Sequence, residues 1–190
     1  MPPTLSYTAD AMAVPAPRAR YDGATIALHW LTAFLIAALW GIGQTRFYVP
    51  AALRHDYLSL HMTLGLALGV LMIGRLIWRA TAGRHLPPVE DRLMHFAATA
   101  MHAALYLLIL GTVALGLTKV WAGGSEVFHL FAFPAFAPGN RALGHLLGGW
   151  HALAANAIMI LAGLHAAAGI FHHLLLRDGV LRRMVPFLKD

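Results

Sequence analysis

Residues 148–176 read GGWHALAANAIMILAGLHAAAGIFHHLLL, an apolar stretch that contains no charged side chain. A helix needs roughly 20 residues to cross the roughly 30 Å hydrocarbon core of a bilayer. Backbone N–H and C=O groups find no water there, so a spanning segment must satisfy them internally, as a helix does. The stretch therefore predicts a transmembrane helix, one long enough to tilt or to project beyond the bilayer.

Three further apolar runs precede this one, at residues 25–44, 57–78 and 96–120. Hydrophobic residues make up 59% of the 190-residue chain and charged residues only 12%, whereas a soluble domain has about a quarter of its residues charged. The mean hydropathy is +0.65. These features exclude an ordinary soluble domain and predict an all-α fold, an integral membrane bundle of four transmembrane helices.

The four runs place one bundle at residues 25–176, between a leader at residues 1–24 and a basic tail at residues 177–190. The leader has no apolar core ahead of a cleavage site, so it does not have the pattern of a signal peptide. We expect it to be disordered, with the first span serving as the membrane-targeting signal. Residues 121–145, between the third and fourth spans, are rich in aromatic residues, Gly and Pro, and predict an interfacial loop with room for a short helix.

The distribution of basic residues predicts the orientation. Four spans place both termini and the connection between the second and third spans on one side of the membrane. That side holds ten Lys and Arg residues, against four on the other side, namely Arg46, Arg54, Lys119 and Arg141. The positive-inside rule then places both termini in the cytoplasm. The net charge is +6. The charged residues flank the apolar runs and form no dense basic stripe, so the net charge does not indicate nucleic-acid binding.

The chain has no cysteine and twelve histidines, more than its eight acidic residues. The lack of cysteine excludes disulfides, zinc–thiolate sites, iron–sulfur clusters and covalent c-type haem. A bound metal would have to be held by His, Met or carboxylate side chains.

Four histidines pair by their depth in the predicted spans. His29 and His165 lie at the cytoplasmic level, while His61 and His151 lie at the outer level. The 14 residues between His151 and His165 correspond to about 21 Å of helix rise and leave both on one helix face. Two facing imidazoles are the axial ligands of a six-coordinate haem b, so the pattern predicts two such haems. Taken singly, each histidine could instead be a hydrogen-bonded helix-end residue.

Two further residues are candidates for the cytoplasmic level. Arg75 lies 14 residues beyond His61, where it could bind haem propionates or simply snorkel to the membrane edge. His172 lies seven residues beyond His165, on the same helix face. It could hydrogen-bond a quinone carbonyl and relay a proton, or contact lipid phosphate. Small residues at 65–69 and 163–168 could make room for porphyrin or serve helix packing.

The remaining histidines divide into two groups. The roles of His95, His102 and His173 stay open: the first two could serve a quinone, propionates or neighbouring helices, and the third most resembles a lipid-facing cation. The other four lie in loops or at span edges and are expected to be solvated, namely His55, His85, His129 and His145.

Five short motifs together resemble the bacterial cytochrome b561 family, closest to its superoxide:ubiquinone oxidoreductases. They are LHW at 28–30, LH at 60–61, WH at 150–151, GLHAA at 163–167 and DGVLRRM at 178–184. The chain is also similar to the cytochrome b subunits of nickel–iron hydrogenases and formate dehydrogenases. One departure is Thr99, which stands where relatives often have the first histidine of HxxHxxLY.

The resemblance implies a bundle in the bacterial inner membrane that passes electrons to ubiquinone, with superoxide as donor. It also implies two b haems, whose ligands are His29, His61, His151 and His165. Superoxide is an anion, so the outer cations, Arg54 and Arg141 among them, could steer it toward the outer haem. Two alternatives remain open: an electron-transfer subunit with a protein redox partner in a larger dehydrogenase or hydrogenase, and a haem-free proton or metal transporter.

Overall fold

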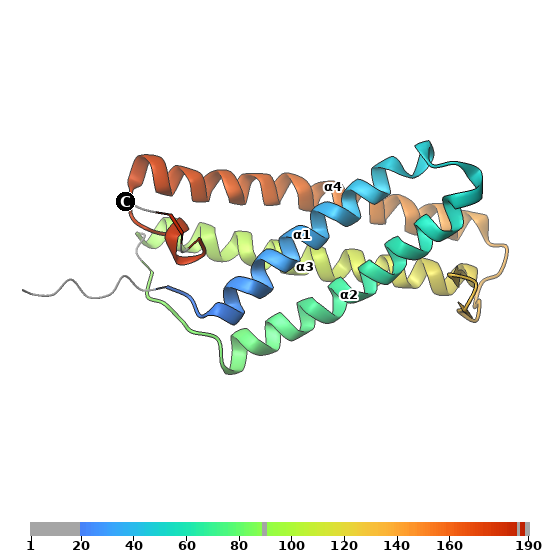
Figure 1. Ribbon diagram of the computed structural model, residues 1–190, viewed down its shortest axis with the longest axis horizontal. Helices are drawn as coiled ribbons and strands as arrows, with labels where there is room; N and C mark the ends of the chain where they lie inside the picture. Colours follow the sequence, from blue (N-terminus) through green and yellow to red (C-terminus); the bar gives the residue numbers. More distant parts are fainter. Residues whose placement is uncertain (1–19, 89–90, 186, 189–190) are drawn as a thin grey trace, which may run out of the picture.

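The computed structural model describes residues 20–88, 91–185 and 187–188. Within these residues, four long helices form an elongated bundle (Figure 1). They are α1 (Gly23–Thr45), α2 (Arg54–Thr81), α3 (Arg92–Gly123) and α4 (Arg141–Phe171). Each is long and apolar enough to cross a membrane. The predicted all-α, four-helix transmembrane bundle is therefore confirmed.

Three of the four helices begin at a side-chain cap. The N-cap residues Asp22, Asp91 and Asn140 each accept a hydrogen bond from the backbone N–H three residues later, at 2.8–3.0 Å. Such caps satisfy donors that the first helical turn leaves unpaired. The helices begin two to seven residues before the predicted spans, because hydropathy detects the apolar part of a helix and misses its polar first turns.

The Asp22 carboxylate also ties the start of α1 to the end of α2. It accepts hydrogen bonds from the backbone N–H of Arg84 at 3.0 Å and from the indole N–H of Trp78 at 3.3 Å. The hydrogen bond from the Thr25 hydroxyl, followed by those from the backbone N–H groups of Arg84 and Thr25, holds the pKa of Asp22 far below its usual range. The carboxylate therefore stays charged and keeps this junction together.

The connections lie at two ends of the bundle (Figure 1). We call one end the hairpin end. There α1 is joined to α2 by two short 3₁₀ turns, η1 (Arg46–Tyr48) and η2 (Ala51–Leu53). Residues 124–140 join α3 to α4 at the same end. The opposite end, the termini end, holds the start of α1, the connection from α2 to α3 and the C-terminal segment.

The α3–α4 connection folds as a small β-hairpin, and the short helix considered for this segment is wrong. Strands β1 (Glu126–Val127) and β2 (Phe131–Ala132) pair antiparallel. Gly124 ends α3 in the left-handed conformation with φ of 69°, which glycine adopts without steric penalty. Phe128 and His129 also have positive φ, 49° and 57°, so the turn reverses the chain before a helical turn can form.

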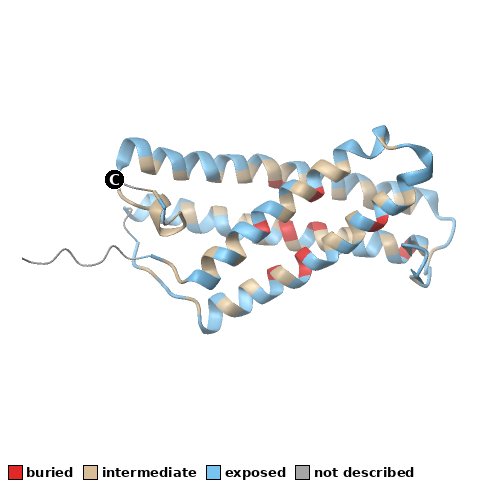
Figure 2. Cartoon of the chain, viewed as in Figure 1, coloured by how far each residue is buried: buried red, intermediate tan, exposed pale blue. Residues whose placement is uncertain are grey.

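The buried core is a thin layer in the middle of the bundle (Figure 2). Within the described residues, its central cluster is Leu39, Leu68, Met72, Ile109 and Ile158. About half of the described large apolar side chains are exposed, as expected of a surface solvated by lipid. Helix α1 packs along α2 and α3 along α4, whereas α1 and α4 approach each other at few positions. The bundle is therefore two helix pairs that meet mainly between α2 and α3.

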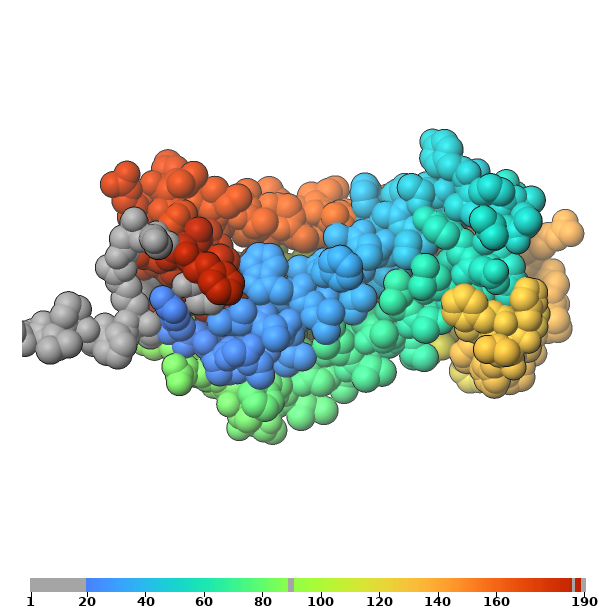
Figure 3. Space-filling view, viewed as in Figure 1, coloured from blue at the N-terminus to red at the C-terminus, as the bar shows by residue number. Residues whose placement is uncertain are grey.

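The C-terminal segment folds back onto the start of α1. Helix α4 continues as a π-helix, η3 (His172–Leu176), and Arg177 then reverses the chain with φ of 53°. The Trp30 indole N–H donates to the Met184 carbonyl at 3.0 Å. Figure 3 shows the described part of the predicted basic tail lying against α1. Of the predicted leader, residues 1–19 lie outside the described residues.

Candidate functional site

Two pairs of imidazoles face each other across the interface between the two helix pairs. The ring centres of His29 on α1 and His165 on α4 are 6.2 Å apart. Those of His61 on α2 and His151 on α4 are 6.0 Å apart. The structure thus brings together the two pairs that the sequence spacing predicts, one at each level of the bundle.

These separations suit two ligands on opposite sides of one metal ion. A metal–imidazole bond of about 2.0 Å and roughly 1.1 Å from that nitrogen to its ring centre put two such rings about 6.3 Å apart. The observed 6.0 and 6.2 Å agree with this value to within a few tenths of an ångström. The residues present therefore fit the axial ligand sets of two b haems.

Helix α3 provides a hydrogen-bond acceptor for the His151 imidazole. The Nδ1–H of His151 donates to the backbone carbonyl of Thr112 at 2.9 Å, which leaves Nε2 as the nitrogen with a free lone pair. Metal-binding histidines usually donate their other ring N–H in this way. Gly116 permits the approach, because a Cβ there would lie 3.1 Å from His151 Cε1. This hydrogen bond was not predicted from the sequence. Its local signal in the sequence is that Thr112 and Gly116 are one helical turn apart.

His61 carries an unsatisfied polar atom. Among the described residues, its Nδ1 is buried and has no hydrogen-bond partner. Buried polar atoms of this kind are rare in folded proteins, so the hydrogen bonding of the His61–His151 pair is incomplete on its α2 side. Of the small residues that could make room for a porphyrin or serve helix packing, Gly69 packs on α3, since a Cβ there would lie 2.9 Å from Val113 Cγ1.

Arg75 lies at the level of His29, as its spacing predicts, and contacts the imidazole directly. Its guanidinium donates to His29 Nδ1 at 3.0 Å and lies 5.3 Å above the Tyr106 ring. An imidazole that accepts at Nδ1 carries its proton on Nε2. This hydrogen bond and metal coordination through Nε2 therefore exclude each other, and Arg75 must release His29 before His29 can bind a metal in that way.

A third imidazole, His102 on α3, lies at the same level. Its ring centre is 5.1 Å from that of His165, in an edge-on arrangement. This distance is more than 1 Å shorter than the roughly 6.3 Å expected across a metal, whereas the His29–His165 distance is close to it. The geometry therefore favours His29 as the partner of His165. His95, seven residues earlier on α3, is exposed.

His172 is held by a carboxylate that sequence reasoning missed. Its Nδ1 donates to Oδ2 of Asp178, and Oδ1 of Asp178 accepts from the Val180 backbone N–H at 3.0 Å. Burial alone would raise the pKa of Asp178, but these hydrogen bonds from His172 and Val180 outweigh it and hold the pKa below its ordinary value. A charged Asp178 accepts from Nδ1–H and orients the imidazole. His173, the next residue of η3, is half-buried.

Cations collect at the hairpin end. The charges of Arg46 and Lys119 interact with both His61 and His151. The Lys119 side chain crosses α4 at Gly148, where a Cβ would lie 3.2 Å from Nζ.

Arg54 and Arg141, the two cations named for steering, are the first residues of α2 and α4, and both are exposed. Arg54 donates to the Val49 carbonyl at 3.0 Å.

Comparison with known proteins gives consistent matches over nearly the whole chain. The profile of the family described as prokaryotic cytochrome b561 matches residues 20–187. Cytochrome b562 of Cereibacter sphaeroides is 34% identical over 87% of this chain and 94% of its own length. Cytochrome b561 homolog 1 of Escherichia coli K12 is 31% identical over 88% and 97%. The probable superoxide oxidase CybB of Yersinia pestis is 28% identical over 88% and 96%.

Proposed function

The chain belongs to the prokaryotic cytochrome b561 family, and from this premise we propose that it carries electrons from superoxide to ubiquinone through two b haems. The family implies b-type haem and membrane electron transfer. The four apolar helices of this chain, together with its family, make the protein a multi-pass bacterial membrane protein. The proposal adds the two-haem stoichiometry, the donor and acceptor, and an inner-membrane location with both termini in the cytoplasm.

The two imidazole pairs are the observation that carries the proposal. His29 and His165 would hold one haem, and His61 and His151 the other. Two ligands from one face of α4 set the two levels about 21 Å apart along the helix axis. Bis-imidazole haem supplies one-electron redox chemistry. The protein contributes the ligands, their orientation and the apolar surroundings.

Superoxide would react at the hairpin end. Its oxidation to oxygen removes one electron and requires no proton, so the protein need only attract the anion. Arg46 and Lys119 supply positive charge at the His61–His151 pair, and Arg54 and Arg141 add charge around the same end of the bundle. Fields of this kind raise the encounter rate of an anion. The name of the Yersinia pestis relative, probable superoxide oxidase, supports this choice of donor.

Ubiquinone would be reduced near η3. Its reduction to the quinol takes two electrons and two protons, so two superoxide anions yield two molecules of oxygen per quinone. His172 would donate a hydrogen bond from Nε2–H to a quinone carbonyl and pass on that proton. Asp178 would act as a positioning residue, because its carboxylate accepts from Nδ1–H and holds the ring in one orientation.

The test uses the purified full chain in detergent, expressed with ample haem. We expect two haems per chain by extraction and a b-type spectrum on reduction. Ubiquinone reduction should begin when superoxide is generated enzymatically, and it should stop when superoxide dismutase is added. A colourless protein, or one with a single haem, would refute the two-haem arrangement. Two haems without superoxide-dependent reduction would refute the donor and favour a protein redox partner.

A further inference from the structure

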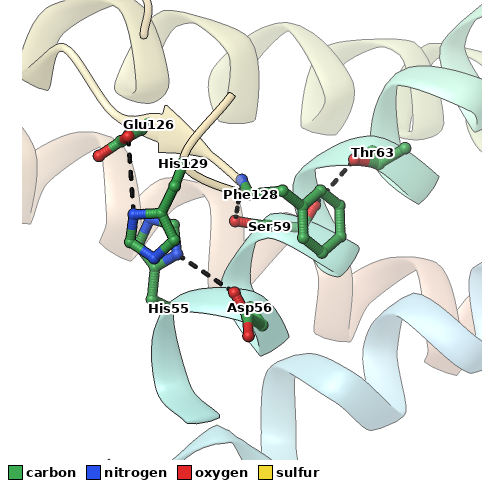
Figure 4. Close-up of polar contacts among 7 residues, drawn as sticks. All are labelled: His55, Asp56, Ser59, Thr63, Glu126, Phe128 and His129. Carbon is green, nitrogen blue, oxygen red and sulfur yellow. Dashed lines mark hydrogen bonds and ion pairs between the residues drawn. The ribbon is translucent and has the colours of Figure 1, made fainter. Parts of the chain in front are cut away.

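Three metal-binding side chains meet at the hairpin end, outside both imidazole pairs (Figure 4). They are His55 in the first turn of α2, Glu126 in β1 and His129 in the turn of the hairpin. One donor atom from each lies within 4.8 Å of the others. Figure 3 shows the hairpin lying against the start of α2, so the fold assembles the cluster from segments about 70 residues apart.

We propose that His55, Glu126 and His129 bind one divalent transition-metal ion, for which Zn²⁺ suits the donor set. Two imidazoles and one carboxylate are a ligand combination that proteins use for zinc, with water in the fourth position. Imidazole disfavours Mg²⁺ and Ca²⁺, which prefer oxygen ligands.

His55 has the features of a preformed ligand. Among the described residues, its Nε2 is buried and has no hydrogen-bond partner. Its Nδ1 lies 3.5 Å from Oδ1 of Asp56. A carboxylate behind one ring nitrogen fixes the orientation of the ring and leaves the other nitrogen for the metal. The solvated histidine expected from the sequence is thus partly enclosed, with Nε2 turned away from solvent.

The side chains of His129 and Glu126 need to move only a short distance to bind an ion. The His129 ring stacks on His55 with centres 3.8 Å apart, and its Nδ1 lies 3.6 Å from Oε1 of Glu126. Ligand atoms of a tetrahedral zinc site lie roughly 3.3 Å from one another, so the donors must approach by about 1.5 Å at most. The side chains of His129 and Glu126 are 67% and 45% exposed, which leaves them free to rotate into place.

The backbone under the cluster is held in position. The Phe128 N–H donates to Oγ of Ser59 at 2.9 Å, and Ser59 is fully buried. This bond pins the hairpin turn to α2 one residue before His129. A site whose backbone is already fixed loses less conformational freedom when an ion binds.

The cluster is separate from the nearby haem-ligand candidate of α2. His55 precedes His61 by six residues, which is 600° of rotation at 100° per residue and leaves the two on different faces. The rise between them is about 9 Å. Variants of Glu126 and His129 should therefore leave haem content unchanged, and the metal proposal can fail without affecting the proposed function.

The experiment measures Zn²⁺ binding to the purified full-length, haem-loaded protein with its affinity tag removed. Isothermal titration calorimetry should show one Zn²⁺ per chain. His129→Ala and the isosteric Glu126→Gln should each weaken binding by at least about 100-fold, since even the loss of outer partners costs 10–100-fold. His145→Ala, which removes an exposed histidine of α4 outside the cluster, should keep the wild-type affinity.

Haem content, measured in each sample, shows that every variant is folded. The proposal is overturned if the wild type takes up no Zn²⁺, or if His129→Ala and Glu126→Gln bind it as tightly as the wild type does. It is also overturned if His145→Ala weakens binding as much as His129→Ala does, because the ion would then be bound by scattered surface histidines.

Discussion

The proton position on each imidazole decides what that residue can do. His151 donates from Nδ1 to the Thr112 carbonyl, so its Nε2 is ready to bind a metal. His29 instead accepts from Arg75 at Nδ1 and carries its proton on Nε2. The His61–His151 pair is thus prepared for a metal on its α4 side, whereas His29 must exchange a proton and lose Arg75. A haem propionate would offer the released guanidinium a new partner.

At this scale we predict that His151→Ala leaves about one haem per chain. The variant removes one axial ligand of the hairpin-end pair and does not touch the pair at the termini end. Haem extraction against protein concentration measures the stoichiometry, and the reduced-minus-oxidised spectrum should lose one component. His61→Ala should have the same effect, whereas the control His145→Ala should keep two haems. Retention of two haems in His151→Ala would refute this ligand assignment.

Among the elements, the end of α4 departs most from regular geometry. The chain widens into the π-helix η3 at His172 and turns back at Arg177. Single π-helical turns occur frequently at functional sites. Here the widened turn and the reversal after it bring the Asp178 carboxylate onto the imidazole of His172. The depressed pKa of Asp178 means that this charge is lost only when the pH falls below the ordinary carboxyl range, near 3.9.

We therefore predict that Asp178→Asn slows ubiquinone reduction by roughly 10-fold, and His172→Ala by up to roughly 100-fold. Asparagine can still accept from Nδ1–H, but as a neutral acceptor it forms a weaker hydrogen bond and orients the ring less firmly. Haem content should be unchanged in both variants. Wild-type turnover in His172→Ala would identify another proton donor.

At the scale of the whole molecule, the bundle is polarised. Two helix pairs meet along an interface lined at two levels by histidines. Cations at the hairpin end act on one level, and the Asp178–His172 pair lies at the opposite end. An anionic donor and a proton-requiring acceptor would thus be served at opposite ends of the bundle.

This polarity predicts a salt-dependent reaction with superoxide. Replacing Arg46 and Lys119 together by Ser should reduce the superoxide-dependent rate by up to about 10-fold at low ionic strength and flatten its dependence on salt. The Arg54→Ser and Arg141→Ser pair, at exposed helix starts, should flatten the dependence less. Stopped-flow rates at several salt concentrations measure both slopes. An unchanged slope in both double variants would remove electrostatic steering from the proposed mechanism.

Local rules were enough for the helices and for the histidine levels. Membrane thickness requires about 20 apolar residues per helix, and the 3.6-residue period places His151 and His165 on one face. Hydropathy, helical rise and periodicity are properties of a segment alone. The number of spans and the two imidazole levels could therefore be predicted without knowledge of the packing.

Only the tertiary structure decided which partners those residues meet. Three of these contacts join separate segments of the chain. They are the hydrogen bond from His151 to the Thr112 carbonyl, the contact of His172 with the Asp178 carboxylate, and the stacking of His129 on His55. The hairpin likewise depends on the left-handed turn at Phe128 and its bond to Ser59. No periodicity encodes such contacts, because they arise from long-range packing and backbone sterics, which a single segment does not contain.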